Sequence, residues 1–237
     1  MSSIRTRSRL AGLLYVVMGA FGFVSIMYIP GKIVVRNDTA ATAANIINSE
    51  SLYRFGILSQ LISQILFIWL ALLFYDLFKQ VDRRNARLLV ALVCVSVAIE
   101  FANTLNMFAP LLLLGNTPFT TAFTRPQLES LSYTFLRLRD MGINNVSSFW
   151  GLWLLPLGLL VMKSGWFPKI LGWLLVVSCV GYVTGSFIHV MFPARMHAAS
   201  MYTLSLGGLG EFAIINWLMF VGARVPNVQE AEYAPAA

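Results

Sequence analysis

Long apolar stretches separated by short polar breaks constrain the fold of this sequence more than any other feature. A helix needs about 20 predominantly apolar residues to cross the hydrocarbon core of a bilayer. The chain has six stretches of this kind, at residues 10–29, 52–78, 88–114, 143–162, 170–192 and 201–221. Only 11% of its residues are charged, whereas a soluble domain has about 25%. We therefore expect an all-α transmembrane bundle of six helices.

The segments between these stretches predict smaller features. Asp38 precedes an Ala-rich run and suits an N-cap, which predicts a short surface helix on the extracytoplasmic side. The segment 119–140 is either an interfacial helix or the extended start of the fourth span, with Leu128, Leu131, Phe135 and Leu138 at helical spacing. Pro156 predicts a kink in that span. We assign residues 1–225 to a single six-helix domain and residues 226–237 to a disordered cytoplasmic tail.

The distribution of Lys and Arg predicts the orientation in the membrane. With six spans both termini lie on one side, and ten basic residues in short breaks and tails fall there: Arg5, Arg7, Arg9, Lys79, Arg83, Arg84, Arg87, Lys163, Lys169 and Arg224. Seven others are spread over longer loops of the opposite side: Lys32, Arg36, Arg54, Arg125, Arg137, Arg139 and Arg195. Basic residues concentrate in cytoplasmic loops, so we expect cytoplasmic termini. Arg137, Arg139 and Asp140 are interpreted as a solvated cluster at the outer mouth.

Several kinds of site are not indicated. The net charge of +7 comes from residues that flank the apolar stretches rather than form a patch, so nucleic-acid binding is not expected. Cys94 and Cys179 lie inside apolar stretches, without ligand spacing, and are interpreted as small buried hydrophobic residues. His189 and His197 are interpreted as interfacial or loop residues rather than ligands of haem or metal. We predict no cofactor and no metal; the expected partner is the lipid bilayer, and the oligomeric state stays open.

Two acidic side chains, Glu100 and Glu211, lie near the middle of the third and sixth apolar stretches. A carboxylate at that depth costs at least about 2 kcal/mol unless it is protonated, partnered or in contact with water. Other polar side chains occur in the outer halves of the spans. The candidate residues for ligand binding or proton transfer are Glu100, Glu211, Asn103, Asn106, Gln60, Gln64, Asn144 and Asn145. One outward-facing pocket would keep all of them out of lipid.

These residue types leave three classes of function open. The preferred one is binding or passage of a small lipophilic or amphiphilic molecule, with the glutamates carrying protons or orienting the ligand. The second is an integral-membrane cyclase or isomerase that uses a protonated glutamate as general acid in a pocket lined by Phe101, Trp150 and Tyr202. The third is a non-catalytic accessory subunit. The Asn, Gln and Ser residues could also be simple interhelical hydrogen-bonding groups, each contributing about 0.6 kcal/mol.

An ordered set of short motifs runs through most of the chain. They are residues 9–15, residues 46–56, Glu100, Gly142-Ile143-Asn144, residues 163–172 and Gly210-Glu211-Phe212. In this order they resemble a family of bacterial multi-pass membrane proteins known as domain of unknown function 4386. The resemblance implies about six helices in a plasma membrane, here the inner membrane of a bacterium. It implies no reaction.

Overall fold

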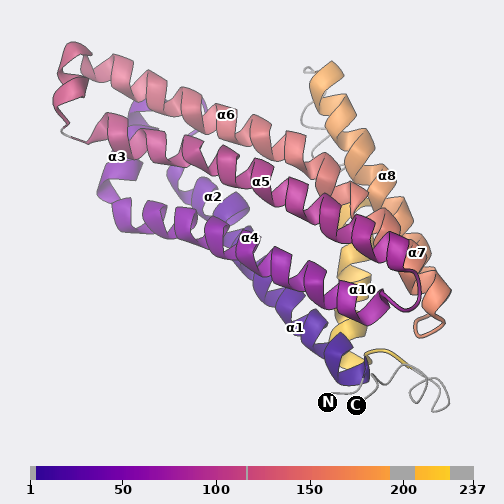
Figure 1. Cartoon of the computed structure of the whole chain (residues 1–237). Helices are drawn as coiled ribbons and strands as arrows, with labels where there is room; N and C mark the ends of the chain where they lie inside the picture. The colour runs from indigo at the N-terminus through magenta and orange to yellow at the C-terminus, as the bar shows by residue number, and fades with distance from the viewer. Residues whose placement is uncertain (1–3, 116, 193–205, 225–237) are drawn as a thin grey trace. The chain divides into compact units, whose positions relative to one another are not determined.

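The computed structural model describes residues 4–115, 117–192 and 206–224. Within these ranges the chain forms helices and no strand, as Figure 1 shows. In chain order they are α1 (Ile4–Phe23), a π-helical turn (Val24–Tyr28), α2 (Ile29–Ile33), α3 (Thr39–Asn48), α4 (Glu50–Phe78), α5 (Arg83–Leu114), a 3-10 turn (Pro118–Ala122), α6 (Arg125–Leu152), α7 (Leu154–Ser164), α8 (Lys169–Met191) and α10 (Gly208–Phe220). The all-α class is confirmed.

Five helical segments are long and apolar enough to cross a membrane. They are Ile4–Ile33, Glu50–Phe78, Arg83–Leu114, Arg125–Ser164 and Lys169–Met191. The sixth predicted span, residues 201–221, contains the shorter apolar helix α10, and its first residues lie outside the described ranges. The helices therefore indicate a membrane-embedded bundle of about the predicted size. The predicted tail, residues 226–237, also lies outside the described ranges.

The mixed segment 119–140 is mostly the extended start of the fourth span. Helix α6 begins where Gln127 Oε1 accepts a hydrogen bond from the Thr124 N–H at 2.8 Å, and α7 continues it to Ser164. The two helices are interrupted at Trp153. Proline has no N–H to donate to the carbonyl four residues earlier, so Pro156 breaks the helical ladder one turn before itself. The surface helix is also present as α3, and Asp38 caps it by accepting from the Ala41 N–H at 2.8 Å.

The chain divides into two compact units, which are described separately. Unit 1 comprises Met1–Val17, Leu66–Val97 and Asn144–Ala237, and unit 2 comprises Met18–Ile65 and Ala98–Ile143. In unit 1 the buried Trp153 ring contacts Phe67 at 5.0 Å and Phe74 at 6.2 Å between ring centroids. Unit 2 packs a cluster of buried residues: Ile29, Ile33, Ala43, Ile46, Tyr53, Ile57, Met107, Leu114 and Leu136. Each unit thus has an apolar core of its own.

The two cysteines differ in their surroundings. Cys179 is buried, as expected for a small hydrophobic residue, whereas Cys94 is exposed on α5. The prediction for Cys94 was wrong because apolar stretches in a membrane helix have an outward face as well as an inward one.

Candidate functional site

Glu100 lies on α5 in unit 2 and its residue is 1% exposed. Gln60 Nε2 donates to its Oε1 at 2.7 Å, and Asn103 Nδ2 donates to its Oε2 at 3.3 Å. Both carboxyl oxygens therefore accept an amide hydrogen bond. Asn106 extends the chain of contacts, since its Nδ2 donates to Asn103 Oδ1 at 3.2 Å. Four of the predicted residues, on helices α4 and α5, are joined in what we call the Glu100 cluster.

Arg139 brings a cation to the Glu100 cluster. The residue is 3% exposed, interacts electrostatically with Glu100, and lies 3.6 Å from the Asp140 carboxylate. Its backbone carbonyl accepts a hydrogen bond from Asn103 Nδ2 at 3.1 Å. Arg137 also pairs with Asp140 at 3.6 Å, and both of these side chains are exposed, as predicted for a solvated cluster. The prediction of a solvated cluster was wrong for Arg139, because successive residues of a helix point about 100° apart and this one faces inward.

A break in the first helix creates the acceptor that holds Arg139. In the π-turn Val24–Tyr28 the Ile29 N–H bonds the carbonyl five residues earlier rather than the Ser25 carbonyl. The next possible donor in this register is residue 30, which is proline and has no N–H. Arg139 Nη2 donates to the Ser25 carbonyl at 3.0 Å instead. The guanidinium thereby satisfies a backbone group that the turn leaves without its helical partner.

Several buried polar atoms on α4 and on Arg139 have no hydrogen-bond partner. Within the described residues, Ser59 Oγ, Gln60 Oε1, Gln64 Oε1 and Arg139 Nε are buried and make no hydrogen bond. Gln60 and Gln64 are one helical turn apart, so their side chains share a face of α4. A buried polar atom left without a hydrogen bond costs about 1–3 kcal/mol. Buried atoms without partners on α4 and on Arg139 therefore indicate that a polar molecule can bind in this unit.

A cavity of about 20 Å³ lies beside Arg139. It is lined by Ile29, Pro30, Ile33, Val34, Tyr53, Met107, Leu136, Arg139 and Asp140. A space of this size holds about one water molecule or one hydroxyl group. The Tyr53 hydroxyl donates to the Met107 carbonyl at 2.8 Å, which leaves its oxygen able to accept. Donor and acceptor groups therefore both line the cavity.

Glu211 lies on α10 in unit 1 and has partners of a different kind. The hydroxyls of Tyr15 on α1 and Tyr182 on α8 donate to its two carboxyl oxygens, the second at 2.7 Å. The Tyr15 ring also contacts Trp153, with centroids 5.8 Å apart. This Glu211 cluster therefore ties three helices together through one carboxyl group. The two glutamates belong to different units, and a pocket shared by both stays a prediction.

The remaining candidates of the fourth span also lie in unit 1. The Asn144 carbonyl accepts from Ser186 Oγ at 3.0 Å, and Ser186 Oγ lies 2.7 Å from Ser147 Oγ. Asn145 is exposed. These contacts are helix-to-helix hydrogen bonds between α6 and α8. Among the described residues there is no group of three His, Cys, Asp or Glu side chains that could hold a metal ion.

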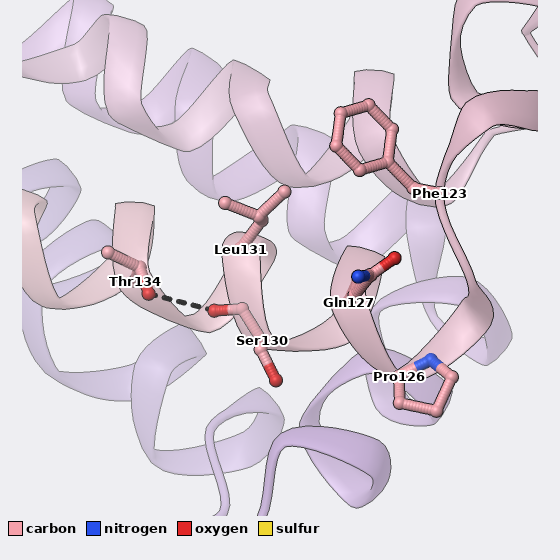
Figure 2. A pocket seen from close by; sticks show the side chains of 6 residues that line it. All are labelled: Phe123, Pro126, Gln127, Ser130, Leu131 and Thr134. Atoms are coloured by element: carbon pink, nitrogen blue, oxygen red, sulfur yellow. Dashed lines mark hydrogen bonds between the residues drawn. The ribbon is translucent and has the colours of Figure 1, made fainter.

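A shallow hollow of about 480 Å³ lies along the beginning of α6, and Figure 2 shows the side chains that line it. It is lined by Phe123, Pro126, Gln127, Ser130, Leu131 and Thr134. All of these residues come from a single segment, and Thr134 Oγ1 already donates to the Ser130 carbonyl at 2.8 Å. The hollow contains none of the candidate residues and no charged group, so we place no site there.

The sequence prediction placed Arg139 in the wrong environment and missed Ser25, Tyr15 and Tyr182. The signal for Arg139 was a second set of residues at helical spacing in the segment 119–140. Its members are all buried: Leu128, Ser132, Leu136 and Arg139. For Ser25 the signal was Pro30 five residues later. The two tyrosines had no signal in the sequence, because partners on distant helices are brought together only by packing.

The chain is similar in sequence to known proteins. A family model described as Domain of unknown function (DUF4386) matches residues 10–222. An uncharacterized protein of Archaeoglobus fulgidus is 32% identical over 110 residues, which cover 46% of this chain and 60% of that relative. The chain thus matches less than two thirds of the relative's length. No solved structure matches.

Proposed function

We propose that this chain, which belongs to the DUF4386 family and has a membrane-embedded helical fold, binds or passes a small amphiphilic molecule. The polar group of that molecule would enter the Glu100 cluster. The observation that carries the proposal is the set of four buried atoms without partners: Ser59 Oγ, Gln60 Oε1, Gln64 Oε1 and Arg139 Nε. A ligand that supplies their hydrogen bonds recovers the free energy that burial costs.

The hydrogen-bonding character of these atoms restricts which polar group the ligand can carry. Arg139 Nε is a donor and requires an acceptor oxygen, while the two glutamine oxygens require donors. A group that both donates and accepts, such as a hydroxyl, satisfies both kinds of atom. Glu100 would orient that group or exchange a proton with it, and Glu211 would do so separately through its two tyrosine hydroxyls. A lipophilic molecule would approach along the exposed apolar faces of the helices.

Thermal unfolding of the full chain in nonionic detergent tests this function. Probes with one decyl chain and different ends, namely decanol, decylamine, decanoate and decane, are added while tryptophan fluorescence reports unfolding. A ligand that binds only the folded state, at 100 times its Kd, stabilises by about 2.7 kcal/mol. We expect decanol to raise the midpoint, and we expect Glu100→Gln and Gln64→Leu to abolish that shift.

The control is Gln127→Leu, which changes an exposed glutamine on α6 in the same way and should leave the shift intact. Equal shifts with decane and decanol, or an unchanged decanol shift in Glu100→Gln, would refute the proposal. Recovery of a chemically altered probe would instead favour the alternative of a membrane enzyme.

We further propose the inner membrane of a bacterium and cytoplasmic termini. The support is that all ten basic residues assigned to the terminal side fall in unit 1. Hydrogen bonds also connect the segments that carry them: Arg5 Nε donates to the Val221 carbonyl at 3.4 Å, and the Arg224 N–H donates to the Trp166 carbonyl at 2.9 Å. A fluorescent protein fused to the C-terminus, of a kind that matures only in the cytoplasm, should fluoresce. A dark but full-length fusion would contradict this orientation.

A further inference from the structure

The α4–α5 and α7–α8 connections of unit 1 are held together by direct contacts. Lys163 Nζ donates to the Asp82 carboxylate across the two connections. The Phe78 ring stacks on Trp166 with centroids 5.9 Å apart and contacts Phe167 at 6.0 Å. Residues 75–87 and 163–169 therefore form one surface, which we call the basic end.

The basic end has an excess of positive charge. Its two segments contain six cationic and two acidic side chains, a net charge of +4. Both acidic groups are already paired, Asp76 with Lys79 at 2.7 Å and Asp82 with Lys163. Four exposed cations make no ion pair in the described part of the chain: Arg83, Arg84, Arg87 and Lys169. The surface is thus suited to an anion that the described part of the chain does not supply.

Local structure places three of these cations on one helix end. Arg83, Arg84 and Arg87 occupy the first turns of α5, and the N–H groups at a helix N-terminus also attract anions. The Tyr75 hydroxyl lies close enough to Arg83 and Arg87 to interact with both. Arg side chains bind phosphate oxygens in a bidentate manner that fixes geometry as well as charge.

Exposed apolar side chains begin directly beside these charges. Leu88 on α5 is 46% exposed, and on α8 Ile170 is 61% and Trp173 is 58% exposed. Tryptophan is enriched where a membrane protein meets the headgroup region. The basic end therefore combines phosphate-binding charge with an apolar surface, and a phospholipid has both of the matching parts.

We propose that the basic end binds an anionic phospholipid, with its phosphate between the arginines of α5 and Lys169 and its acyl chains along Leu88, Ile170 and Trp173. Basic clusters at the ends of transmembrane helices recognise anionic lipids in this way. This site does not use Glu100 or any residue of unit 2, so it stands or falls separately from the function proposed above.

Native mass spectrometry of the full chain, titrated with phosphatidylglycerol or phosphatidylcholine, tests this site. We expect the anionic lipid to bind at least about tenfold more tightly than the zwitterionic one. The triple variant Arg83→Gln, Arg84→Gln, Arg87→Gln should weaken phosphatidylglycerol binding about a hundredfold. The matched control, Arg125→Gln with Arg137→Gln, neutralises exposed arginines of unit 2 and should leave binding unchanged.

Two further measurements on the unmodified chain keep the test decisive if the triple variant does not fold. Higher salt should weaken phosphatidylglycerol binding, because exposed charges are screened. Glycerol phosphate, the soluble headgroup alone, should compete poorly since it lacks acyl chains. Equal affinity for the two lipids, binding that salt does not change, or full binding by a folded triple variant would each overturn the proposal.

Discussion

Replacing Arg139 by methionine removes the cation of the Glu100 cluster and keeps an unbranched side chain in its place. The Ser25 carbonyl then loses its donor at 3.0 Å, and Glu100 loses the charge that attracts it. The buried guanidinium also pairs with the partly exposed Asp140 at 3.6 Å, and removing one member of a buried charged pair costs about 3–5 kcal/mol. A stranded backbone carbonyl accounts for about 1–3 kcal/mol of this. We expect Arg139→Met to lower the free energy of unfolding by about 3–5 kcal/mol.

A second substitution isolates the part of this loss that comes from the Ser25 carbonyl. Pro30→Ala restores an N–H at the position that donates to Ser25 in the π-turn register. In the Pro30→Ala background the carbonyl has a backbone donor, so Arg139→Met should cost about 1–2 kcal/mol less. The coupling between the two substitutions therefore measures the proposed contact rather than general damage to packing.

Unfolding of the four variants of this cycle can be followed by tryptophan fluorescence during titration with sodium dodecyl sulfate in mixed micelles. Arg137→Met is the matched control, because Arg137 lies two residues away, is exposed, and also pairs with Asp140 at 3.6 Å. It should cost less than about 1 kcal/mol. A cycle in which the effects of Pro30→Ala and Arg139→Met simply add would refute the account of the π-turn.

Three other predictions follow from single contacts. Tyr182→Phe removes a donor at 2.7 Å from Glu211 and should lower the free energy of unfolding by about 1.5–3 kcal/mol. When Glu211 is also replaced by Leu, the same substitution should cost less than about 1 kcal/mol. A double-mutant cycle in mixed micelles measures this difference. The hydrogen bond from Lys163 and the bonds from the following turn lower the pKa of Asp82. Its contribution to stability is therefore complete well above about pH 4 and is lost only as the pH falls from there through the lowered pKa of the folded state. The melting temperatures of the chain and of Asp82→Asn should differ most at pH 7, and the difference should be smaller but still present at pH 3. Gly142→Ala places a Cβ on the asparagine amide that contacts Glu100 and should lower the free energy of unfolding by about 1–3 kcal/mol; a neutral result would show that this amide is free to move.

The sequence alone determined the class of fold and the approximate limits of its helices. Length and apolarity decide whether a helix can cross a bilayer, and both are properties of consecutive residues. The Asp38 cap and the break near Pro156 were likewise predictable, because they depend on groups a few positions apart in the chain. Glu100 stood out for the same reason, since a carboxyl within an apolar stretch is visible without knowing its neighbours.

Only the tertiary structure decided which side chains surround each glutamate. In the segment after Pro126, residues at helical spacing form two stripes, one that includes Leu138 and one that includes Arg139. Packing buries Arg139, whereas Leu138 stays 46% exposed. Glu100 and Glu211 look alike in the sequence, yet amides partner the first and tyrosine hydroxyls the second. Apolar length reports the environment of a whole helix, whereas the rotation of each helix about its axis depends on contacts with segments far away in the chain. That rotation determines which polar groups meet inside the protein.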